Sequence, residues 1–485
     1  MFEIRITGTD KLNPYEELIK VFLQPSEYRL IGADDDAKAG ELIPKAGAGA
    51  DSEAIIPLTY RFDGDSDAVK RQIYRDLEQH TGKSPKWGIL TGIRPVKLAY
   101  ELTYGQRRDA SSDETAVDST AARMRTDEIL KERYLLHPAK RHLVQEILEY
   151  QRQTAGEPAE RSLSVYLGIP FCPTRCLYCS FTSNQVGTPE IRRYLQALHR
   201  EIEYAGAAAA EDGFRVESVY FGGGTPTTPD PDQLDRLLEA MERHFDLSQI
   251  REFTVEAGRP DTITEQKLAV LRAHGVDRIS INPQSMHQRT LDRIGRRHTV
   301  LQTEEAFALA KAAGFDCINA DLIAGLPGED FPDFAQSLER VTALGADNIT
   351  LHTLAVKRAS RLKEMDENYN YKQEVLREEM LAHAAKRLRE EGFAPYYLYR
   401  QKHTSGSTEN IGYCREDKIS VYNIRIMEER QSILALGAGG ISKIWFPAEN
   451  RLERIANVSN YEIYIDRIDE MIARKHAKFF GQTTR

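Results

Sequence analysis

Short apolar runs alternate with amphipathic stretches through the middle of the chain, from Ser164 to Leu354. In two of these stretches the apolar side chains recur at helical spacing, which predicts helices that bury one stripe each. The stripes consist of Leu234, Leu237, Leu238, Met241 and Phe245, and of Phe331, Phe334, Leu338 and Val341. Thr299 and Gln302 fit a capping box that opens a further helix.

The apolar runs themselves predict strands. They cover Ser164–Ile169, Glu217–Phe221, Glu252–Glu256, Arg278–Ile281, Cys317–Ile323 and Asn348–Leu354. Because each run is followed by a helical pattern, the connections imply right-handed crossovers and a parallel sheet, closed or partly closed like a barrel. The predicted fold class is therefore α/β, with a partial (β/α)6 barrel at its centre.

The pattern before residue 160 is mixed. MFEIRI, EYRLIG and AIIPLTYRF are typical of strands, and Asn13–Phe22, Asp67–Gln79 and Pro138–Gln153 are typical of helices. Small and polar residues predict loops or insertions at Ala37–Ser52 and Gln106–Arg123, and a linker at Ala155–Arg161. We expect an N-terminal α+β accessory domain over 1–160, a barrel core over 161–394 and a C-terminal, lid-like domain over 395–485. The stretch Thr91–Lys97, T-G-I-R-P-V-K, is either a functional basic loop or an ordinary turn with solvated charges.

Composition narrows the class of protein. Of 485 residues, 41% are hydrophobic and 29% charged, which is typical of soluble globular proteins. We expect no membrane span, because no apolar run approaches the roughly 20 residues needed. The N-terminus lacks the pattern of a secretory signal, so we expect a cytoplasmic protein. A net charge of -9 argues against nucleic-acid binding.

Three of the five cysteines lie close together in Y-L-G-I-P-F-C-P-T-R-C-L-Y-C, just after the first predicted barrel strand. Parallel α/β folds place their chemistry at this end of the strands. The spacing of Cys172, Cys176 and Cys179 lets three thiolates surround one compact cluster, and Pro170 and Pro173 keep the loop from forming a helix. Thiolates without a nearby histidine suit iron–sulfur better than zinc. Structural zinc and unligated buried cysteines are the alternatives.

This spacing, together with the flanking aromatic Tyr178, resembles the signature of the radical S-adenosylmethionine superfamily. The resemblance extends over roughly residues 164–445. It implies a [4Fe–4S] cluster on Cys172, Cys176 and Cys179, whose fourth iron is open to the amine and carboxylate of S-adenosylmethionine. Reductive cleavage of that ligand then gives methionine and a 5′-deoxyadenosyl radical, which abstracts hydrogen from the substrate.

The resemblance also implies which strand ends bind S-adenosylmethionine. The G-G-G-T-P loop, with Gly223, Gly224 and Thr225, matches the loop for its amino group, since missing side chains let backbone approach a ligand. Arg296 corresponds to an arginine that binds its carboxylate. The remaining implied contacts are Tyr166, Tyr178, Glu256, Gln284, Asp321 and Ile441. A tight turn, a salt-bridge carboxylate and close packing around Leu436–Ser442 are the structural alternatives.

The ordered motifs Y-x-G-I-P-F-C, F-G-G-G-T-P-T, P-Q-S, D-L-I-x-G-L-P and G-A-G-x-S resemble the oxygen-independent coproporphyrinogen III oxidase family. Its long Firmicute-type branch, the coproporphyrinogen dehydrogenases, also carries T-G-I-R-P in an N-terminal extension. The resemblance implies oxidative decarboxylation of two propionates of coproporphyrinogen III to vinyls, giving protoporphyrinogen IX in haem biosynthesis. It also implies an electron donor such as flavodoxin or ferredoxin.

Two positions beside the cysteines differ from the established oxidases: Gly168 replaces histidine and Phe181 replaces cysteine. Phenylalanine at the second position also occurs in a related branch of haem carriers. The haem motif H-N-x-x-Y-W of that branch is absent, because the corresponding stretch reads Y-N-I-R-I-M-E-E-R-Q. A haem carrier and another radical reaction on a tetrapyrrole are the alternative functions.

Basic residues after the sixth predicted strand are candidates for binding propionates, or else form a solvated basic loop. They are Lys357, Arg358 and Arg361. The remaining cysteines, Cys317 and Cys414, are isolated in sequence and are predicted to be structural thiols.

Overall fold

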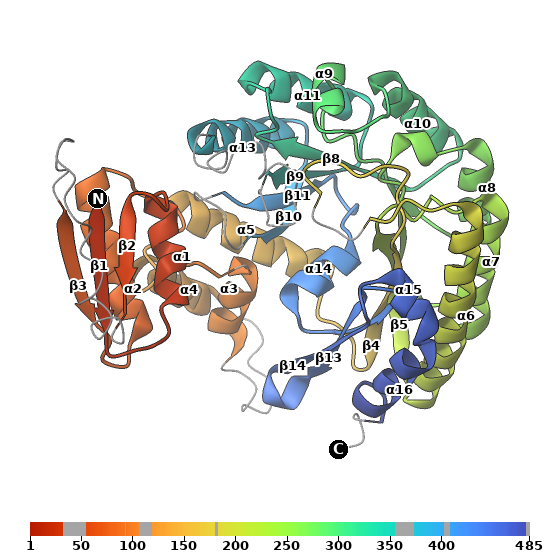
Figure 1. Ribbon diagram of the computed structural model, residues 1–485, viewed down its shortest axis with the longest axis horizontal. Helices are drawn as coiled ribbons and strands as arrows, with labels where there is room; N and C mark the ends of the chain where they lie inside the picture. Colours follow the sequence, from red (N-terminus) through yellow and green to blue (C-terminus); the bar gives the residue numbers. More distant parts are fainter. Residues whose placement is uncertain are drawn as a thin grey trace, which may run out of the picture. The chain divides into compact units, whose positions relative to one another are not determined.

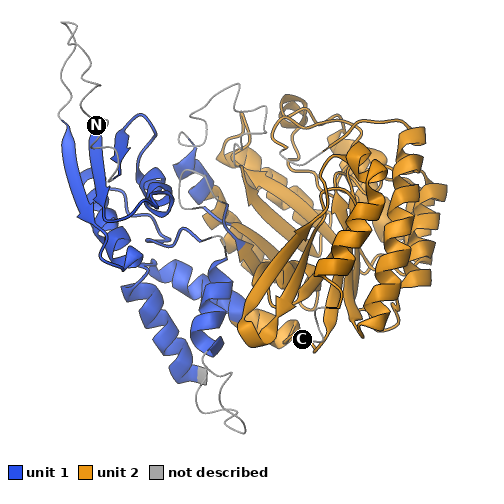
Figure 2. Ribbon diagram, turned by 60° about the horizontal axis from the view of Figure 1, so that its bottom comes forward, with its two compact units in different colours: residues 1–148, 363–378, 399–409 blue, residues 149–362, 379–398, 410–485 orange. Residues whose placement is uncertain are grey.

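The computed structural model describes residues 1–32, 55–92, 94–105, 119–179, 183–354, 373–401 and 408–481. The chain divides into two units, coloured separately in Figure 2. The first unit contains residues 1–148, 363–378 and 399–409, and the second contains 149–362, 379–398 and 410–485. The division into three domains expected from the sequence stays a prediction.

A parallel sheet forms the centre of the second unit, as the alternating pattern predicted (Figure 1). Its strands are β4 (Ser162–Ile169), β5 (Arg215–Gly223), β6 (Glu252–Glu256), β7 (Arg278–Ser280), β8 (Cys317–Ala324) and β9 (Asn348–Thr353). Each pairs in parallel with the next along the chain. The carboxyl ends of these strands therefore meet at one end of the barrel, which we call the mouth, and their amino ends at the other, which we call the base.

Five further strands extend this sheet on both sides. They are β10 (Ala394–Tyr399), β11 (Asn410–Cys414), β12 (Ser432–Leu436), β13 (Ile441–Phe446) and β14 (Arg451–Ala456). β11 is antiparallel to β9, and β12 pairs in parallel with β4. The C-terminal segment thus adds strands to the sheet of the barrel, and in the described residues the order is β10-β11-β9-β8-β7-β6-β5-β4-β12-β13-β14.

Helices α6 to α11 lie on the outer side of the sheet (Figure 1). The helices of this half of the chain are α6 (Thr188–Glu211), α7 (Pro231–His244), α8 (Glu265–Ala273), α9 (Gln288–Arg293), α10 (Val300–Ala312), α11 (Phe331–Ala343), α13 (Glu374–Glu390), α14 (Val421–Glu428), α15 (Tyr461–Asp466) and α16 (Ile468–Lys478). The predicted stripe of α7 is buried, with Leu234, Leu237, Leu238 and Met241 all inaccessible to solvent. The predicted capping box of Thr299 and Gln302 opens α10.

The first unit contains a separate three-stranded sheet of β1 (Phe2–Thr7), β2 (Tyr28–Ile31) and β3 (Ile56–Arg61), in the order β2-β1-β3. Both pairs are parallel. The helices here are α1 (Asn13–Phe22), α2 (Ser66–Thr81), α3 (Pro95–Tyr104), α4 (Ser119–Glu132) and α5 (Pro138–Thr154), the last of which continues into the second unit. Buried residues of α1 and α2 pack on the strands around Ile4, Ile6 and Tyr60.

The structure describes the end of one predicted loop and none of another. Helix α4 begins at Ser119, so the C-terminal end of the loop predicted over Gln106–Arg123 is helical instead, because Thr120–Arg123 continue the helical run into Met124. The other predicted loop, Ala37–Ser52, lies outside the described residues.

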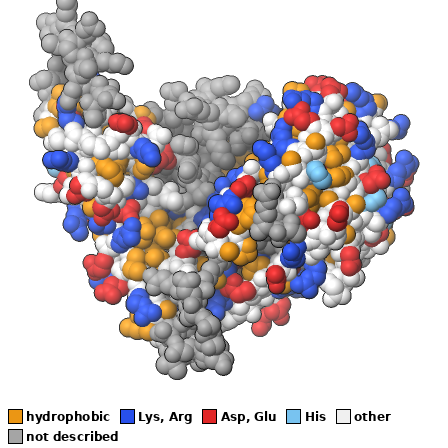
Figure 3. All heavy atoms as spheres, turned by 90° about the horizontal axis from the view of Figure 1, so that it is seen from below, with side chains coloured by type: hydrophobic (Ala, Val, Ile, Leu, Met, Phe, Trp, Pro, Cys, Tyr) orange, Lys and Arg blue, Asp and Glu red, His pale blue; other side chains and the backbone are white. Residues whose placement is uncertain are grey.

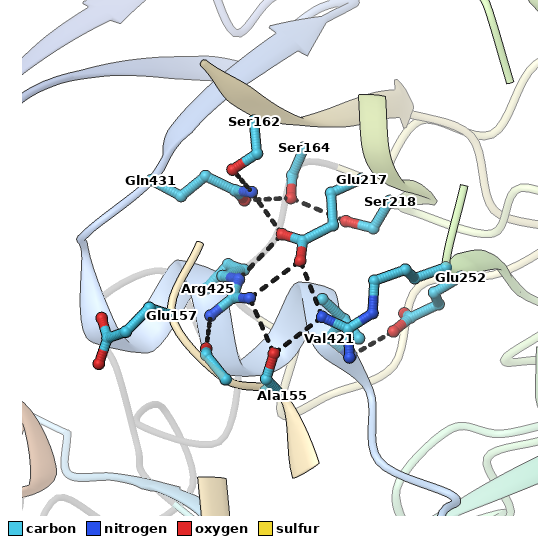
Figure 4. Close-up of polar contacts among 12 residues, drawn as sticks. Ala155, Glu157, Ser162, Ser164, Glu217, Ser218, Glu252, Val421, Arg425 and Gln431 are labelled. Atoms are coloured by element: carbon cyan, nitrogen blue, oxygen red, sulfur yellow. Dashed lines mark hydrogen bonds and ion pairs between the residues drawn. The ribbon is translucent and has the colours of Figure 1, made fainter. Parts of the chain in front are cut away.

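The base of the barrel is closed by a network of polar side chains around Glu217 (Figure 4). Arg425 on α14 donates two hydrogen bonds to the Glu217 carboxylate, both 2.9 Å long, and Gln431 Nε2 donates a third of 2.5 Å. Gln431 also bonds Ser162 and Ser164 at the start of β4. Although burial raises the pKa of Glu217, Arg425 holds it below its usual range. The carboxylate is therefore ionised and fully satisfied.

A second carboxylate at the base holds the N-terminus of α14. Glu252, the first residue of β6, accepts hydrogen bonds from the Ser420 hydroxyl at 2.9 Å and from the backbone N–H of Val421. Its negative charge lies at the positive end of the helix dipole. Helix α14 is thus fixed to the base of the barrel at its N-terminus by Glu252 and at its middle by the Arg425–Glu217 ion pair.

Among the described residues, no helix combines the length and apolarity needed to cross a membrane. On the face drawn in Figure 3, basic and acidic side chains are interspersed.

Candidate functional site

The three clustered cysteines lie in a loop at the mouth, directly after β4. Backbone hydrogen bonds fix this loop at both ends: Cys172 N–H donates to Asn184 at 3.0 Å, and Leu177 N–H donates to Ile294 at 2.9 Å. Phe171 is buried and packs edge-on against Tyr194, with ring centroids 5.1 Å apart. The structure thus places the cysteine loop where the sequence predicted it, and backbone hydrogen bonds join it to Asn184 and Ile294.

The thiols themselves are suited to metal rather than to a free state. Cys176 is buried, and Cys172 and Cys179 are half-buried. Burial raises the pKa of Cys172 to about 11; a hydrogen bond from Thr225 opposes the rise, and Cys179 and Cys176 add to it. Ionising this buried thiol is favoured by added positive charge, which iron supplies.

A cluster fits this donor set better than a single ion. Among the described residues, no three Cys, His, Asp or Glu side chains converge closely enough to ligate one metal ion. A four-iron cube binds each thiolate through a different iron and so spreads its ligands farther apart. The three cysteines therefore fit a [4Fe–4S] cluster.

The glycine loop after β5 packs directly on the cysteine loop. A Cβ atom on Gly224 would lie 2.6 Å from the Phe171 carbonyl oxygen and 3.0 Å from the Cys172 sulfur. Gly223 has a φ of 112°, which L-residues with side chains rarely adopt. The next residue, Thr225, donates its hydroxyl to the Cys172 sulfur at 3.4 Å. Glycine is required here because the backbone of one loop touches the other.

Two predicted acidic residues come together across the mouth. Glu256 ends β6 and accepts a hydrogen bond from Tyr220 at 2.6 Å. Burial raises the pKa of Glu256 to about 7, and the negative charge of Asp321 adds to the rise. Asp321 on β8 accepts from Asn319 at 2.9 Å and lies 3.3 Å from His352 Nε2. A buried carboxyl whose pKa is raised this far is typical of a ligand site.

Aromatic rings line the barrel beside these acids. Tyr166, predicted as a cofactor contact, stacks on Tyr220 at a centroid distance of 6.3 Å and on Tyr422 at 6.2 Å. Tyr220 and Tyr422 stack more closely, at 4.4 Å. Sequence reasoning missed Tyr220 and Tyr422.

Gln284 is held in an unusual backbone conformation. Its φ is 70°, although it is not glycine, and its backbone bonds Asp321 at 2.9 Å and Ile323 at 3.1 Å. Left-handed conformations of such residues cost about 1–3 kcal/mol and cluster at functional sites. Its side-chain Oε1 is buried and, like Oδ1 of nearby Asn282, has no hydrogen-bond partner among the described residues. Both oxygens are available to a ligand.

Arg296 is buried beside the cysteine loop. Its Nη1 donates to the carbonyls of Asn282 at 2.6 Å and Gly258 at 3.1 Å, and its Nε donates to Tyr178 at 3.3 Å. The remaining nitrogen, Nη2, donates to none of the described residues. The guanidinium is thus oriented by the protein and keeps one donor group for a carboxylate.

The final glycine segment lies against the end of β4. Tyr194 donates its hydroxyl to the Gly168 carbonyl at 2.6 Å and accepts from Ala438 N–H at 2.9 Å. The carbonyl of Ala438 would lie 3.4 Å from a Cβ atom on Gly168, so backbone occupies the space beside this glycine. Ile441 begins β13 just beyond and is 48% exposed. The segment therefore joins the mouth, and the adenine contact of Ile441 stays a prediction.

Several predicted features lie outside the described residues: Phe181, the basic candidates Lys357, Arg358 and Arg361, and Ile93 of the T-G-I-R-P stretch. The two isolated cysteines are buried, as predicted for structural thiols: the Cys317 sulfur accepts from Arg278 at 2.9 Å, and Cys414 lies 3.6 Å from the Tyr150 hydroxyl.

Comparison with known proteins agrees with this geometry. Residues 166–341 match the family model described as the radical SAM superfamily. An oxygen-independent coproporphyrinogen-III oxidase-like protein, HemZ of Bacillus subtilis, is 42% identical over 409 residues, which are 82% of this chain and 78% of that protein. The chain belongs to this family of radical SAM proteins. Members of the superfamily use a [4Fe–4S] cluster and S-adenosylmethionine.

Two further proteins are similar to parts of this chain. The heme chaperone HemW of Mycobacterium tuberculosis is 37% identical over 210 residues, which are 43% of this chain and 52% of that protein. The solved structure of coproporphyrinogen III oxidase, HemN, from Escherichia coli has a TM-score of 0.51 at 24% identity, over 67% of this chain and 73% of that one. This structural similarity confirms the predicted radical SAM fold.

Proposed function

We propose that this radical SAM protein converts coproporphyrinogen III to protoporphyrinogen IX by oxidative decarboxylation of two propionates. The observation that carries the proposal is the extent of the relationship: similarity to the oxidase-like HemZ covers 82% of this chain, whereas similarity to the HemW chaperone covers 43%. The relationship therefore includes most of the chain and not the radical core alone.

When bound, the cluster and S-adenosylmethionine supply a carbon-centred radical able to remove hydrogen from an unactivated carbon. The protein's own part in the proposal is binding and orientation. Cys172, Cys176 and Cys179 hold iron, Arg296 holds the carboxylate of the ligand through Nη2, and Glu256 and Asp321 accept from its hydroxyl and amino groups. Tyr166 and Tyr178 border this ligand.

The proposed reaction removes one hydrogen atom from the β-carbon of a propionate, and that hydrogen ends on 5′-deoxyadenosine. The bond to the carboxylate then breaks and releases carbon dioxide. One electron leaves to an acceptor, and a vinyl group remains. Because the carboxylate leaves as carbon dioxide, no side-chain base is needed.

We further propose that a low-potential electron carrier such as flavodoxin or ferredoxin reduces the cluster, and that the protein works in the cytoplasm, where thiols stay reduced. The basic residues Lys357, Arg358 and Arg361 stay candidates for the propionates of the tetrapyrrole.

The region that corresponds to the haem motif of the carriers supports catalysis over haem transport. In this chain it forms α14, whose Tyr422 stacks on Tyr220 and whose Arg425 is buried in the ion pair with Glu217. These side chains are engaged in the barrel and offer no histidine for haem iron.

Mass spectrometry of an anaerobic assay tests the proposal. Reduced protein with S-adenosylmethionine and coproporphyrinogen III should yield a tetrapyrrole lighter by one, and then two, units of carbon dioxide plus two hydrogens, in step with 5′-deoxyadenosine. Haem carriage would instead give tight stoichiometric haem binding and an unaltered tetrapyrrole. That result would replace the proposed reaction with the carrier function.

A further inference from the structure

A buried arginine that belongs to none of the predicted contacts lies behind the cysteine loop. Arg259 follows β6 and is 3% exposed. Its guanidinium forms a two-bond ion pair with Asp261, Nε to Oδ1 at 2.9 Å and Nη2 to Oδ2 at 2.8 Å. Asp261 therefore fixes the plane of the guanidinium and the direction of its remaining nitrogen.

That remaining nitrogen points into the loop between the first two cysteines. Nη1 donates to the Thr174 hydroxyl at 2.7 Å and lies 4.0 Å from the Cys176 sulfur, within the range of a weak hydrogen bond to sulfur. Cys176 is the buried cysteine of the three. The Arg259 guanidinium thus contacts both the loop, through Thr174, and the sulfur of Cys176.

Asp261 balances the charge of Arg259, but Nη1, the positive end of this ion pair, faces the cysteine loop. His298 is fully buried nearby, and neither ring nitrogen has a partner among the described residues. Burial, and then the charges of Arg296 and Arg259, lower the pKa of His298 to about 3, so the ring is neutral at physiological pH. His298 therefore adds no charge to those of Arg259, Arg296 and Asp261.

A role in stability alone does not explain why the buried Arg259–Asp261 pair faces the cysteine loop. Burying two charges is costly, and well-packed apolar residues often replace such pairs without loss of stability. An ion pair aimed at a thiolate has a further effect, because hydrogen bonds and charges around cluster sulfurs set the reduction potential. Reduction adds one negative charge to the cluster, and a nearby cation favours that state.

We propose that Arg259 is a positioning residue that orients the cysteine loop through Thr174 and raises the reduction potential of the cluster bound by Cys172, Cys176 and Cys179. The inference rests on the cluster assignment within the proposed function, but not on the identity of the tetrapyrrole. Asp261 has the supporting role of holding the guanidinium in place.

The test is an anaerobic redox titration, followed by electron paramagnetic resonance, of wild type and the neutral pair Arg259→Gln with Asp261→Asn. We expect the double variant to bind the same amount of iron and, at a fixed potential, to have at least a tenfold lower ratio of reduced to oxidised cluster, which is a midpoint shift of about 59 mV for one electron. Arg251→Gln is the matched control, because Arg251 pairs with Glu217 at the base. It should leave the titration unchanged.

An unchanged midpoint in the iron-loaded double variant overturns the inference. If that variant does not bind iron, Arg259→Lys decides. It keeps the charge but loses the two-bond geometry that aims it, and we expect at least a threefold lower ratio of reduced to oxidised cluster at a fixed potential. An unshifted midpoint overturns the inference. The titration contains no substrate. A failed decarboxylation assay beside a shifted midpoint would therefore remove the proposed reaction and leave the role of Arg259 standing.

Discussion

Buried carboxyl and amide groups at the base and at the mouth of the barrel differ in their hydrogen bonding and in their pKa. At the base, the oxygens of Glu217 accept hydrogen bonds from Arg425, Gln431 and Arg251, and Arg425 holds its pKa below the usual range. At the mouth, the pKa of Glu256 is raised to about 7, and Oε1 of Gln284 has no partner among the described residues.

This difference distinguishes polar groups that stabilise the fold from polar groups that are placed to bind a ligand. Nearly all buried polar groups in folded proteins are hydrogen-bonded, so the side-chain oxygens of Gln284 and Asn282 at the mouth, which have no partner among the described residues, need a reason. A ligand that completes their hydrogen bonds gives that reason, and the cysteine loop lies at the same end. We conclude that the base stabilises the barrel and that the mouth is organised for cofactors.

The largest expected effect concerns the cysteines. Replacing Cys176 with alanine should abolish iron binding, because two thiolates cannot hold the cube in place. Replacing Cys414, which is buried away from the mouth, should leave the iron content unchanged. Iron and sulfide analysis of anaerobic preparations measures both. Equal iron content in the Cys176 and Cys414 variants would contradict the assignment of iron binding to the cysteines at the mouth alone.

The next effect concerns the base. Replacing Arg425 with methionine leaves Glu217 buried without its principal partner, and we expect a loss of about 3–5 kcal/mol in the free energy of unfolding. Denaturant unfolding of the apoprotein measures this loss. Adding Glu217→Gln should recover part of it.

The exposed pair Arg243 and Glu239 on α7 provides the control. Replacing Arg243 with glutamine should change the free energy of unfolding by less than about 1 kcal/mol. If Arg425→Met costs no more than this control, the base network has no special role in stability.

At the mouth we expect losses of binding rather than of stability. Glu256→Ala or Asp321→Ala should weaken S-adenosylmethionine binding by about 1.5–3 kcal/mol, which is roughly tenfold to more than a hundredfold. The iron content should not change, since neither residue ligates iron in the proposal. Calorimetric titration of the cluster-loaded protein measures affinity, and unchanged affinity in both variants would refute their roles.

The smallest effect is a dependence on pH. Because the pKa of folded Glu256 is about 7 and its ordinary value is 4.5, its contribution to stability is present below pH 4.5 and is lost as pH rises through 7. Between pH 5 and 8, the free energy of unfolding of the wild-type apoprotein should therefore fall relative to Glu256→Gln, by about 1–3 kcal/mol. Parallel pH profiles of the two proteins would show that Glu256 titrates normally.

The framework of the barrel could be predicted from the sequence because its signals are local. Each of the parallel strands is short, rich in apolar residues and followed by a helical pattern, and β6 begins and ends at the predicted residues, Glu252 and Glu256. The cysteine spacing and the glycine loop are equally local. The structure therefore places these motifs at one end of one sheet, as predicted.

Partners far apart in the sequence could not be predicted. Glu217 and Arg425 are 208 positions apart, and no local pattern links them. Tyr422 lies in an ordinary amphipathic helix, so nothing in its neighbourhood indicates stacking on Tyr220. For Arg259, the signal was available: an arginine three residues after the strand-end Glu256, followed two residues later by aspartate, indicates a charge held near the mouth.

The most direct test of the account is the electron paramagnetic resonance spectrum of the reduced wild-type protein, recorded with and without S-adenosylmethionine, together with its iron and sulfide content. The account predicts about four irons and four sulfides per chain and a spectrum that changes when S-adenosylmethionine is added, because the fourth iron is open to the ligand. Bound zinc without labile sulfide, or a cluster spectrum that S-adenosylmethionine leaves unaltered, would contradict it.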